Sequence, residues 1–159
     1  MKKITLLISM LLLCLFKANA QEPKFVSIEP ANRNVLIEEF TGRNCGWCPL
    51  GQKTVNNIIK NNPGRVFTIN IHSQSSLSPT SYPNLNTLKG ADIAKAFSDG
   101  SLPQAVVNRS TEKAVGLYTT ADKWAPMTNE QLQQAAECNI AGQVEINKET
   151  RLAKITVEV

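Results

Sequence analysis

Two cysteines separated by two residues, Cys45 and Cys48, are the strongest candidates for chemistry in this sequence. A Cys-x-x-Cys pair suits reversible thiol–disulfide exchange, because the second thiol can resolve a mixed disulfide formed at the first. The same spacing also supplies half of a zinc site. A zinc site needs two further ligands, and the mature chain offers only Cys138 and His72, so no metal is expected. A structural disulfide that is never exchanged, and metal carriage by the pair with one such partner, stay open as alternatives.

The pair lies between two predicted elements, and this position bears on its reactivity. Residues 35–40 form a short apolar run rich in strand formers, which Thr41 and Gly42 end, and a helical pattern follows Cys48. Unpaired N–H groups and the dipole at the start of a helix favour negative charge. Cys45 is therefore expected to have a lowered pKa and to act as the nucleophile. Cys48, one helical turn further on, is expected to resolve the mixed disulfide.

The pattern of the remaining chain predicts an α/β fold. Leu50, Val55, Ile58 and Ile59 are spaced to line one face of the helix, and a strand at 66–72 follows it. A strand, a helix and a strand in this order form a βαβ unit with two parallel strands. The other predicted elements are a surface loop at 73–90, a short helix at 91–97, a strand at 105–107, a helix opened by a capping box at 128–131 and extending to about 137, and a β-hairpin at 142–159 with its turn at 147–150.

The first twenty residues have the three parts of a secretory signal peptide. Lys2 and Lys3 form the positive start, residues 4–16 are almost entirely apolar, and residues 18–20 are Ala-Asn-Ala, which predicts cleavage before Gln21. The apolar run is too short to span a bilayer as a stable helix, so no transmembrane helix is expected after cleavage. The mature protein is expected to meet an oxidising compartment, where the cysteine pair spends part of its life as a disulfide.

The mature chain is close to electrically neutral. Cleavage removes three lysines and leaves fourteen basic against thirteen acidic residues, a net charge of +1. Without a basic cluster this balance gives no electrostatic attraction for nucleic acid or an anionic membrane, and neither partner is expected. The third mature cysteine, Cys138, is expected to be buried or to pair with a group outside the chain.

Residues 39–49, Glu-Phe-Thr-Gly-Arg-Asn-Cys-Gly-Trp-Cys-Pro, resemble the active-site segment of the thioredoxin superfamily. More narrowly, residues 35–49 resemble the 28-kilodalton outer-membrane-protein-related family of Gram-negative bacteria, which are secreted thioredoxin-like proteins with a β-rich region after that domain. The resemblance implies an α/β, thioredoxin-like fold with helices on both faces of the sheet. It also implies an inserted loop or helix before a cis-proline strand, and a location in the periplasm or at the outer membrane.

The same resemblance implies roles for further residues. Glu39 lies six residues before Cys45, where thioredoxins carry a buried acid that can take the proton of the resolving cysteine, here Cys48. Leu102 and Pro103 resemble the cis-proline loop, whose backbone binds an extended substrate. Trp47, beside the second cysteine, is assigned with that loop to substrate binding.

Two glutamates compete for the role of the buried acid. Strand alternation points Glu38 and Glu39 to opposite faces of the sheet, so only one of them can serve the cysteines. The other is expected to face water, and a water-facing Glu39 stays open as the alternative. His72, at the end of its strand, is expected to be structural or solvated.

These observations lead to one main prediction and one competitor. The domains expected are a signal peptide at 1–20, a lead-in at 21–34, a thioredoxin-like domain at 35–138 and a hairpin at 139–159, which either completes the domain or begins a further β-rich one. The main prediction is thiol–disulfide exchange on exported cell-envelope proteins, without a cofactor, with a redox donor or acceptor in the envelope. Reductase, oxidase and isomerase all fit. The competitor is a non-catalytic binding or structural module of the outer membrane or periplasm.

Overall fold

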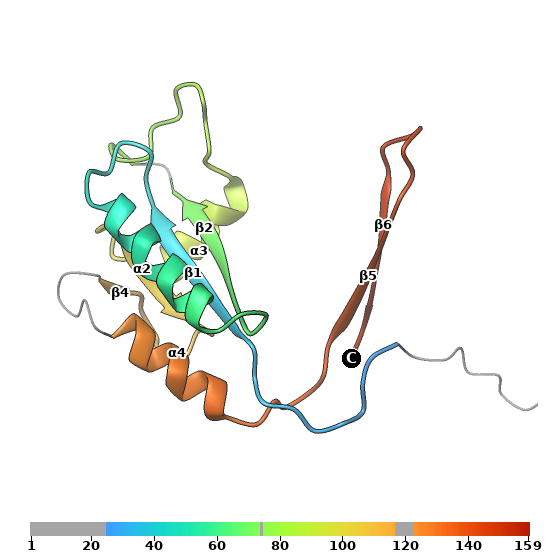
Figure 1. Cartoon of the computed structure of the whole chain (residues 1–159). Helices are drawn as coiled ribbons and strands as arrows, with labels where there is room; N and C mark the ends of the chain where they lie inside the picture. Colours follow the sequence, from blue (N-terminus) through green and yellow to red (C-terminus); the bar gives the residue numbers. More distant parts are fainter. Residues whose placement is uncertain (1–24, 74, 117–122) are drawn as a thin grey trace, which may run out of the picture. The chain divides into compact units, whose positions relative to one another are not determined.

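The computed structural model describes residues 25–73, 75–116 and 123–159, and the predicted signal peptide lies outside them. The chain separates into two compact units. The larger unit holds residues 30–137, and the described part of the smaller one joins residues 25–29 to 138–159. Figure 1 shows the α/β unit and the hairpin unit.

The larger unit is built on a four-stranded sheet in the order β2-β1-β3-β4. β1 (Val35–Thr41) pairs in parallel with β2 (Val66–His72), so the predicted βαβ unit is confirmed. β3 (Gln104–Val107) runs antiparallel to β1, and the two-residue β4 (Val115–Gly116), which sequence patterning missed, runs antiparallel to β3. This order and these directions confirm the expected α/β, thioredoxin-like arrangement.

Within the described residues, three helices pack on the sheet: α2 (Cys48–Asn61), α3 (Leu88–Phe97) and α4 (Trp124–Gln133). Val55 and Ile58 bury the apolar face of α2, but Leu50, predicted to share that face, is exposed. α3 begins earlier than expected, because the Thr87 hydroxyl accepts a hydrogen bond from the Gly90 N–H and caps its first turn.

The predicted start of α4 is wrong. The capping box at 128–131 lies inside the helix, where the Thr128 hydroxyl donates to the carbonyl of Trp124, 2.8 Å away. The helix starts four residues earlier with Pro126 in its first turn, a position that does not need the missing N–H. Trp124 is fully buried, and its Nε1–H donates to the Val115 carbonyl at 2.9 Å.

The core lies on both faces of the sheet, because β1 is central and alternates its side chains. One cluster packs β1 against α2 and α4, and the other packs it against α3. The first cluster is formed by Val35, Ile37, Val55, Ile58, Val66, Ala105, Val107 and Trp124, and the second by Phe40, Ile71, Ala94 and Val106. Helices therefore cover both faces, as the resemblance implies.

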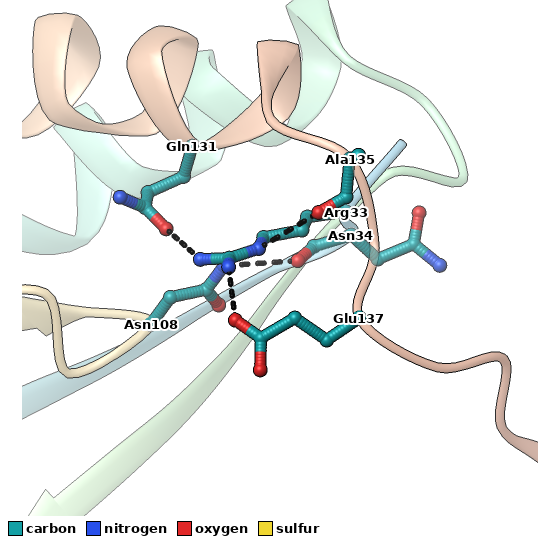
Figure 2. A network of polar contacts seen from close by, with 6 residues as sticks. All are labelled: Arg33, Asn34, Asn108, Gln131, Ala135 and Glu137. Carbon is teal, nitrogen blue, oxygen red and sulfur yellow. Dashed lines mark hydrogen bonds and ion pairs between the residues drawn. The ribbon is translucent and has the colours of Figure 1, made fainter. Parts of the chain in front are cut away.

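A polar network joins the chain before β1 to the chain after α4 (Figure 2). The Arg33 guanidinium donates to the Ala135 carbonyl at 3.2 Å and to the Gln131 side chain at 3.4 Å, and it pairs with the Glu137 carboxylate. Backbone bonds add to it, from the Arg33 N–H to the Gln134 carbonyl and from the Ala136 N–H to the Ala31 carbonyl. This network closes the larger unit at its own chain ends.

The smaller unit is the predicted hairpin. β5 (Ala141–Ile146) pairs antiparallel with β6 (Ala153–Glu158), and the Asn147 side chain accepts hydrogen bonds from the N–H groups of Glu149 and Thr150 in the turn. The Glu158 carboxylate accepts from the N–H groups of residues 25 and 26 and so holds the lead-in against the hairpin. No helix within the described ranges is long and apolar enough to cross a bilayer.

Candidate active site around Cys45 and Cys48

Cys45 and Cys48 form a disulfide at the start of α2, with their Cα atoms 5.4 Å apart. The two residues are 7% and 4% exposed. The Cys48 N–H donates to Cys45 Sγ at 3.1 Å, and Pro49, the next residue, has no N–H to compete for it. The first donor of the helix is thus directed at the sulfur that is predicted to be the nucleophile. This is the arrangement that favours a thiolate there.

The turn that carries the disulfide is fixed by backbone hydrogen bonds. The Cys45 N–H donates to the Gly42 carbonyl at 3.1 Å, and the Asn44 N–H donates to the Leu77 carbonyl at 2.8 Å. Trp47 lies between the cysteines and is 63% exposed, so its ring is at the surface beside the disulfide. Two backbone hydrogen bonds therefore hold the turn, and one large aromatic side chain on it is accessible.

Glu39 is a fully buried acid on β1. It is 0% exposed, and neither carboxyl oxygen has a hydrogen-bond partner among the described residues. Burial disfavours the charged form and raises the pKa of Glu39 to about 7. The alternative of a water-facing Glu39 is therefore wrong. The carboxyl group can hold or release a proton near neutral pH.

Gly51 and Pro103 enclose the Glu39 carboxyl, and sequence analysis missed the glycine. A Cβ added to Gly51 would lie 2.6 Å from Glu39 Oε1 and 3.0 Å from Pro103 Cβ. Helix α2, the acid and the proline loop therefore meet at a point where only a hydrogen fits. A glycine inside a predicted helix was the available signal, because it lowers helix stability and is kept where packing requires it.

The Leu102–Pro103 peptide bond is cis, as expected. The loop before it is held by Gln104, whose side-chain amide donates to Asp99 Oδ1 at 2.6 Å and to the Ser101 hydroxyl at 2.8 Å. Hydrogen bonds from Ser101 are the main cause that lowers the pKa of Asp99. Leu102 approaches the cysteine turn, since a Cβ on Gly42 would lie 3.1 Å from its side chain. The structure thus places the predicted proline loop against both the acid and the turn.

The expectation that one of the two glutamates faces water is wrong. Glu38 is also buried, at 4% exposed, because the central strand is covered on both faces. Arg109 compensates its charge with two hydrogen bonds of 2.8 and 2.7 Å, and the guanidinium stacks 5.0 Å from the centre of the Phe97 ring. The pair with Glu38 raises the pKa of Arg109.

His72 and Cys138 are the two remaining candidate residues. His72 Nδ1 is 3.2 Å from the Ser78 hydroxyl, and burial lowers the pKa of the imidazole, so the expectation of a structural histidine fits its surroundings. Cys138 is a free and exposed thiol, so the expectation of a buried one is wrong. No group of three or more potential metal-binding side chains occurs within residues 25–73, 75–116 and 123–159.

Comparisons with known proteins give only distant likenesses. No protein-family profile and no curated protein match the chain. The structure is similar to HBP35 of Porphyromonas gingivalis, with a TM-score of 0.47 and 17% identity over 74% of this chain. It is also similar to a structural-genomics protein of Agrobacterium tumefaciens, with a TM-score of 0.43 and 16% identity over 74% of this chain. The chain covers 38% and 54% of these two proteins, and the thioredoxin-like assignment of the fold rests on its own strand order.

Proposed function

We propose that this protein catalyses thiol–disulfide exchange on exported proteins through Cys45 and Cys48. The observation that carries the proposal is the Cys48 N–H directed at Cys45 Sγ at the start of α2, with the enclosed acid Glu39 against the neighbouring turn of the helix. The first feature favours a reactive sulfur, and the second supplies a proton acceptor whose pKa of about 7 suits neutral conditions.

In the reducing direction, the Cys45 thiolate attacks one sulfur of a substrate disulfide. A mixed disulfide forms, the substrate S–S bond breaks, and the first substrate thiolate leaves and takes a proton from water. Cys48 then loses its proton and attacks Cys45 Sγ, which releases the second substrate thiolate. Two electrons pass to the substrate and the Cys45–Cys48 disulfide is formed. Oxidation of a substrate is the same sequence in reverse.

Glu39 is proposed to accept the proton that Cys48 loses in the second step. A carboxyl that is half ionised near pH 7 can accept this proton in one direction and return it in the other. The backbone at Leu102 and the ring of Pro103 are proposed to hold an extended substrate across the disulfide, with Trp47 on the opposite border. Substrate binding is thus proposed to use groups from two separate segments of the larger unit.

The site of action is proposed to be the cell envelope, in the periplasm or associated with the outer membrane. The support is the sequence of residues 1–20, which has the features of a secretory signal peptide. In that compartment the substrates are exported proteins with thiols or disulfides, and the redox partner is a donor or acceptor of the envelope. Peptide sequencing of the exported protein should find Gln21 at its N-terminus.

Three assays and one trap test the activity. The reduced protein should reduce insulin, the oxidised protein should oxidise a reduced substrate, or the protein with a reduced Cys45 should rescue scrambled ribonuclease, whose disulfides rearrange only after a thiolate attacks them. A Cys48→Ser variant should accumulate a mixed disulfide at Cys45 with peptide substrates, whereas Cys45→Ser should trap none. If all three assays fail and no mixed disulfide is trapped at Cys45, the proposed exchange activity is rejected.

A non-catalytic module with a structural disulfide is the second candidate. The low exposure of the two cysteines favours it, since a buried disulfide is slow to exchange. Alkylation at mildly acid pH separates the two: after reduction, an active-site Cys45 should react faster than the exposed Cys138. Equal or slower labelling of Cys45, with no exchange activity, would establish the structural role.

A further inference from the structure

The chain between β2 and α3 lies beside the cysteine turn. β1 and β2 are parallel and end in register at Thr41 and His72, so the segments that follow them leave the same edge of the sheet (Figure 1). One of these segments carries Cys45. The other includes residues 75–86, here called the 75–86 loop, which contains no charged residue.

The 75–86 loop is joined to each of the three residues directly before Cys45. The Leu77 carbonyl accepts from the Asn44 N–H at 2.8 Å, and a Cβ on Gly42 would lie 2.5 Å from the same oxygen. The Arg43 guanidinium donates to the Tyr82 carbonyl at 2.9 Å and to the Ser81 hydroxyl at 2.8 Å. The position of the loop relative to the disulfide is therefore set by several independent contacts.

Polar groups inside the loop hold its shape. Ser78 is buried, and its hydroxyl donates to the Asn86 side chain at 3.0 Å while lying 3.2 Å from His72 Nδ1. The Asn86 amide in turn donates to the carbonyls of Ser78 and Pro79, at 3.0 and 3.2 Å. Because polar groups supply this support, the apolar side chains of the loop are not needed for an internal core.

Those apolar side chains are exposed to different extents. Tyr82 is 96% exposed, and Leu77 and Leu85 are also exposed. Across the cysteine turn, Trp47 and Leu50 are exposed too. Large apolar groups held on a fixed backbone lose little entropy when they bind, so they are suited to contact a partner.

We infer that the 75–86 loop is a substrate-selecting wall of the exchange site, in which Leu77 and Tyr82 bind uncharged, apolar side chains next to the reacting cysteine of an unfolded protein. The inference rests on the proposed function, because the partner is delivered by the exchange reaction at Cys45. The side chains of the loop itself carry no charge that could compensate a charged segment for lost hydration, whereas apolar segments gain from burial. The preferred substrates are therefore exported chains that have not yet buried the apolar sequence around their cysteines.

The test compares two disulfide-bonded peptides that differ only beside their cysteines, one with Leu and Phe and the other with Ser and Asn. The measured quantity is the ratio of their kcat/KM values for reduction, with dithiothreitol regenerating the full-length mature protein. The hydrogen bonds that Asn44 and Arg43 make to Leu77 and Tyr82 use the backbone carbonyls of these two residues. A Leu77→Ser/Tyr82→Ser variant therefore retains them. We expect this variant to lower the apolar-to-polar ratio about fivefold to tenfold, as partial burial of these two side chains against a substrate predicts.

Phe67→Ser is the matched control, because Phe67 is an exposed apolar residue at the opposite end of β2 from His72. This control should keep the wild-type ratio. An unchanged ratio in the double variant, or an equal fall in the control, would overturn the inference while leaving exchange itself intact. If the wild type reduces neither peptide nor a small disulfide such as oxidised glutathione, the proposed function fails instead.

Discussion

Adjacent acids on one strand, Glu38 and Glu39, are both buried but have different surroundings. Glu38 accepts two hydrogen bonds from the guanidinium of Arg109. Glu39 has no such donor in the described part of the chain, so burial acts on it alone and raises its pKa to about 7. Glu38 is therefore a structural acid, whereas Glu39 can exchange a proton near neutral pH.

Replacing Glu39 with glutamine should remove a pH dependence of stability. The folded-state pKa of about 7 lies above the unfolded value of 4.5, so the wild type has its full stability below pH 4.5 and loses it as pH rises towards 7. The loss amounts to about 3 kcal/mol on linkage grounds. In urea unfolding of the oxidised proteins, the free energy of unfolding of Glu39→Gln relative to that of the wild type should rise by that amount between pH 4.5 and pH 8. A constant difference across this range would contradict an enclosed, titrating acid.

Gly51→Ala should destabilise the protein although alanine is the better helix former. The new methyl group would lie 2.6 Å from Glu39 Oε1 and 3.0 Å from the Pro103 ring, both of them enclosed. Overpacking of this kind costs about 1–3 kcal/mol, against a helix-propensity gain of about 1 kcal/mol. A net loss of about 1 kcal/mol should appear in urea unfolding. Gly46→Ala is the control, since nothing lies within 4 Å of its added Cβ, and a loss as large there would remove the steric explanation.

At the scale of elements, the residues around strand β1 show which features could be predicted from the sequence and which could not. The apolar run at 35–40, the strand at 66–72 and the breakers between them were enough to predict the βαβ unit, because these signals are local. Burial of Glu38 was not predictable in this way, since its partner Arg109 follows another strand 71 residues later. Gly51 likewise has a role only once the proline loop packs against α2.

Helix boundaries show the same limit. The Thr-Asn-Glu-Gln pattern at 128–131 is a valid capping box, yet Trp124 starts the helix earlier because its indole is fully buried and bonded to Val115. Tertiary burial therefore overrides a local cap. Within the candidate site, the local sequence pattern predicted the start of the helix at Cys48. The resemblance to the thioredoxin superfamily predicted the roles of Glu39 and Pro103. No local sequence pattern predicted the hydrogen bonds between Arg43 and the 75–86 loop.

The Glu38–Arg109 pair should show strong non-additivity, because it joins β1 to the turn after β3. Arg109→Met leaves the Glu38 carboxylate buried without its cation, which lowers stability more than replacing both charges does. The urea midpoint of Arg109→Met should therefore lie below that of the Glu38→Leu/Arg109→Met double variant. If the double variant is instead the less stable of the two, the unpaired Glu38 carboxylate carries no such penalty and this argument is wrong.

At the scale of the whole molecule, both clusters of buried apolar residues belong to residues 30–137. The hairpin unit exposes the large apolar side chains of its strands, including Val144, Ile146 and Ile155. A two-stranded hairpin is marginal in water on its own. Cooperative folding is therefore expected to belong to the larger unit, which contains the whole candidate site.

A mature chain that ends at Glu137 should accordingly unfold in one cooperative transition and keep the wild-type reactivity of its cysteine pair. Its free energy of unfolding should lie within about 1 kcal/mol of the full chain, because the network around Arg33 stays complete (Figure 2). A chain that ends four residues earlier, at Gln133, is the matched control. It loses the carbonyl acceptors of Gln134 and Ala135 and the Ala136 N–H donor, which should cost about 2–3 kcal/mol at roughly 1 kcal/mol for each hydrogen bond. Equal stability of the two shortened chains would show that the network does not close the unit, and loss of cooperative unfolding in the longer one would show that the hairpin is part of its folding.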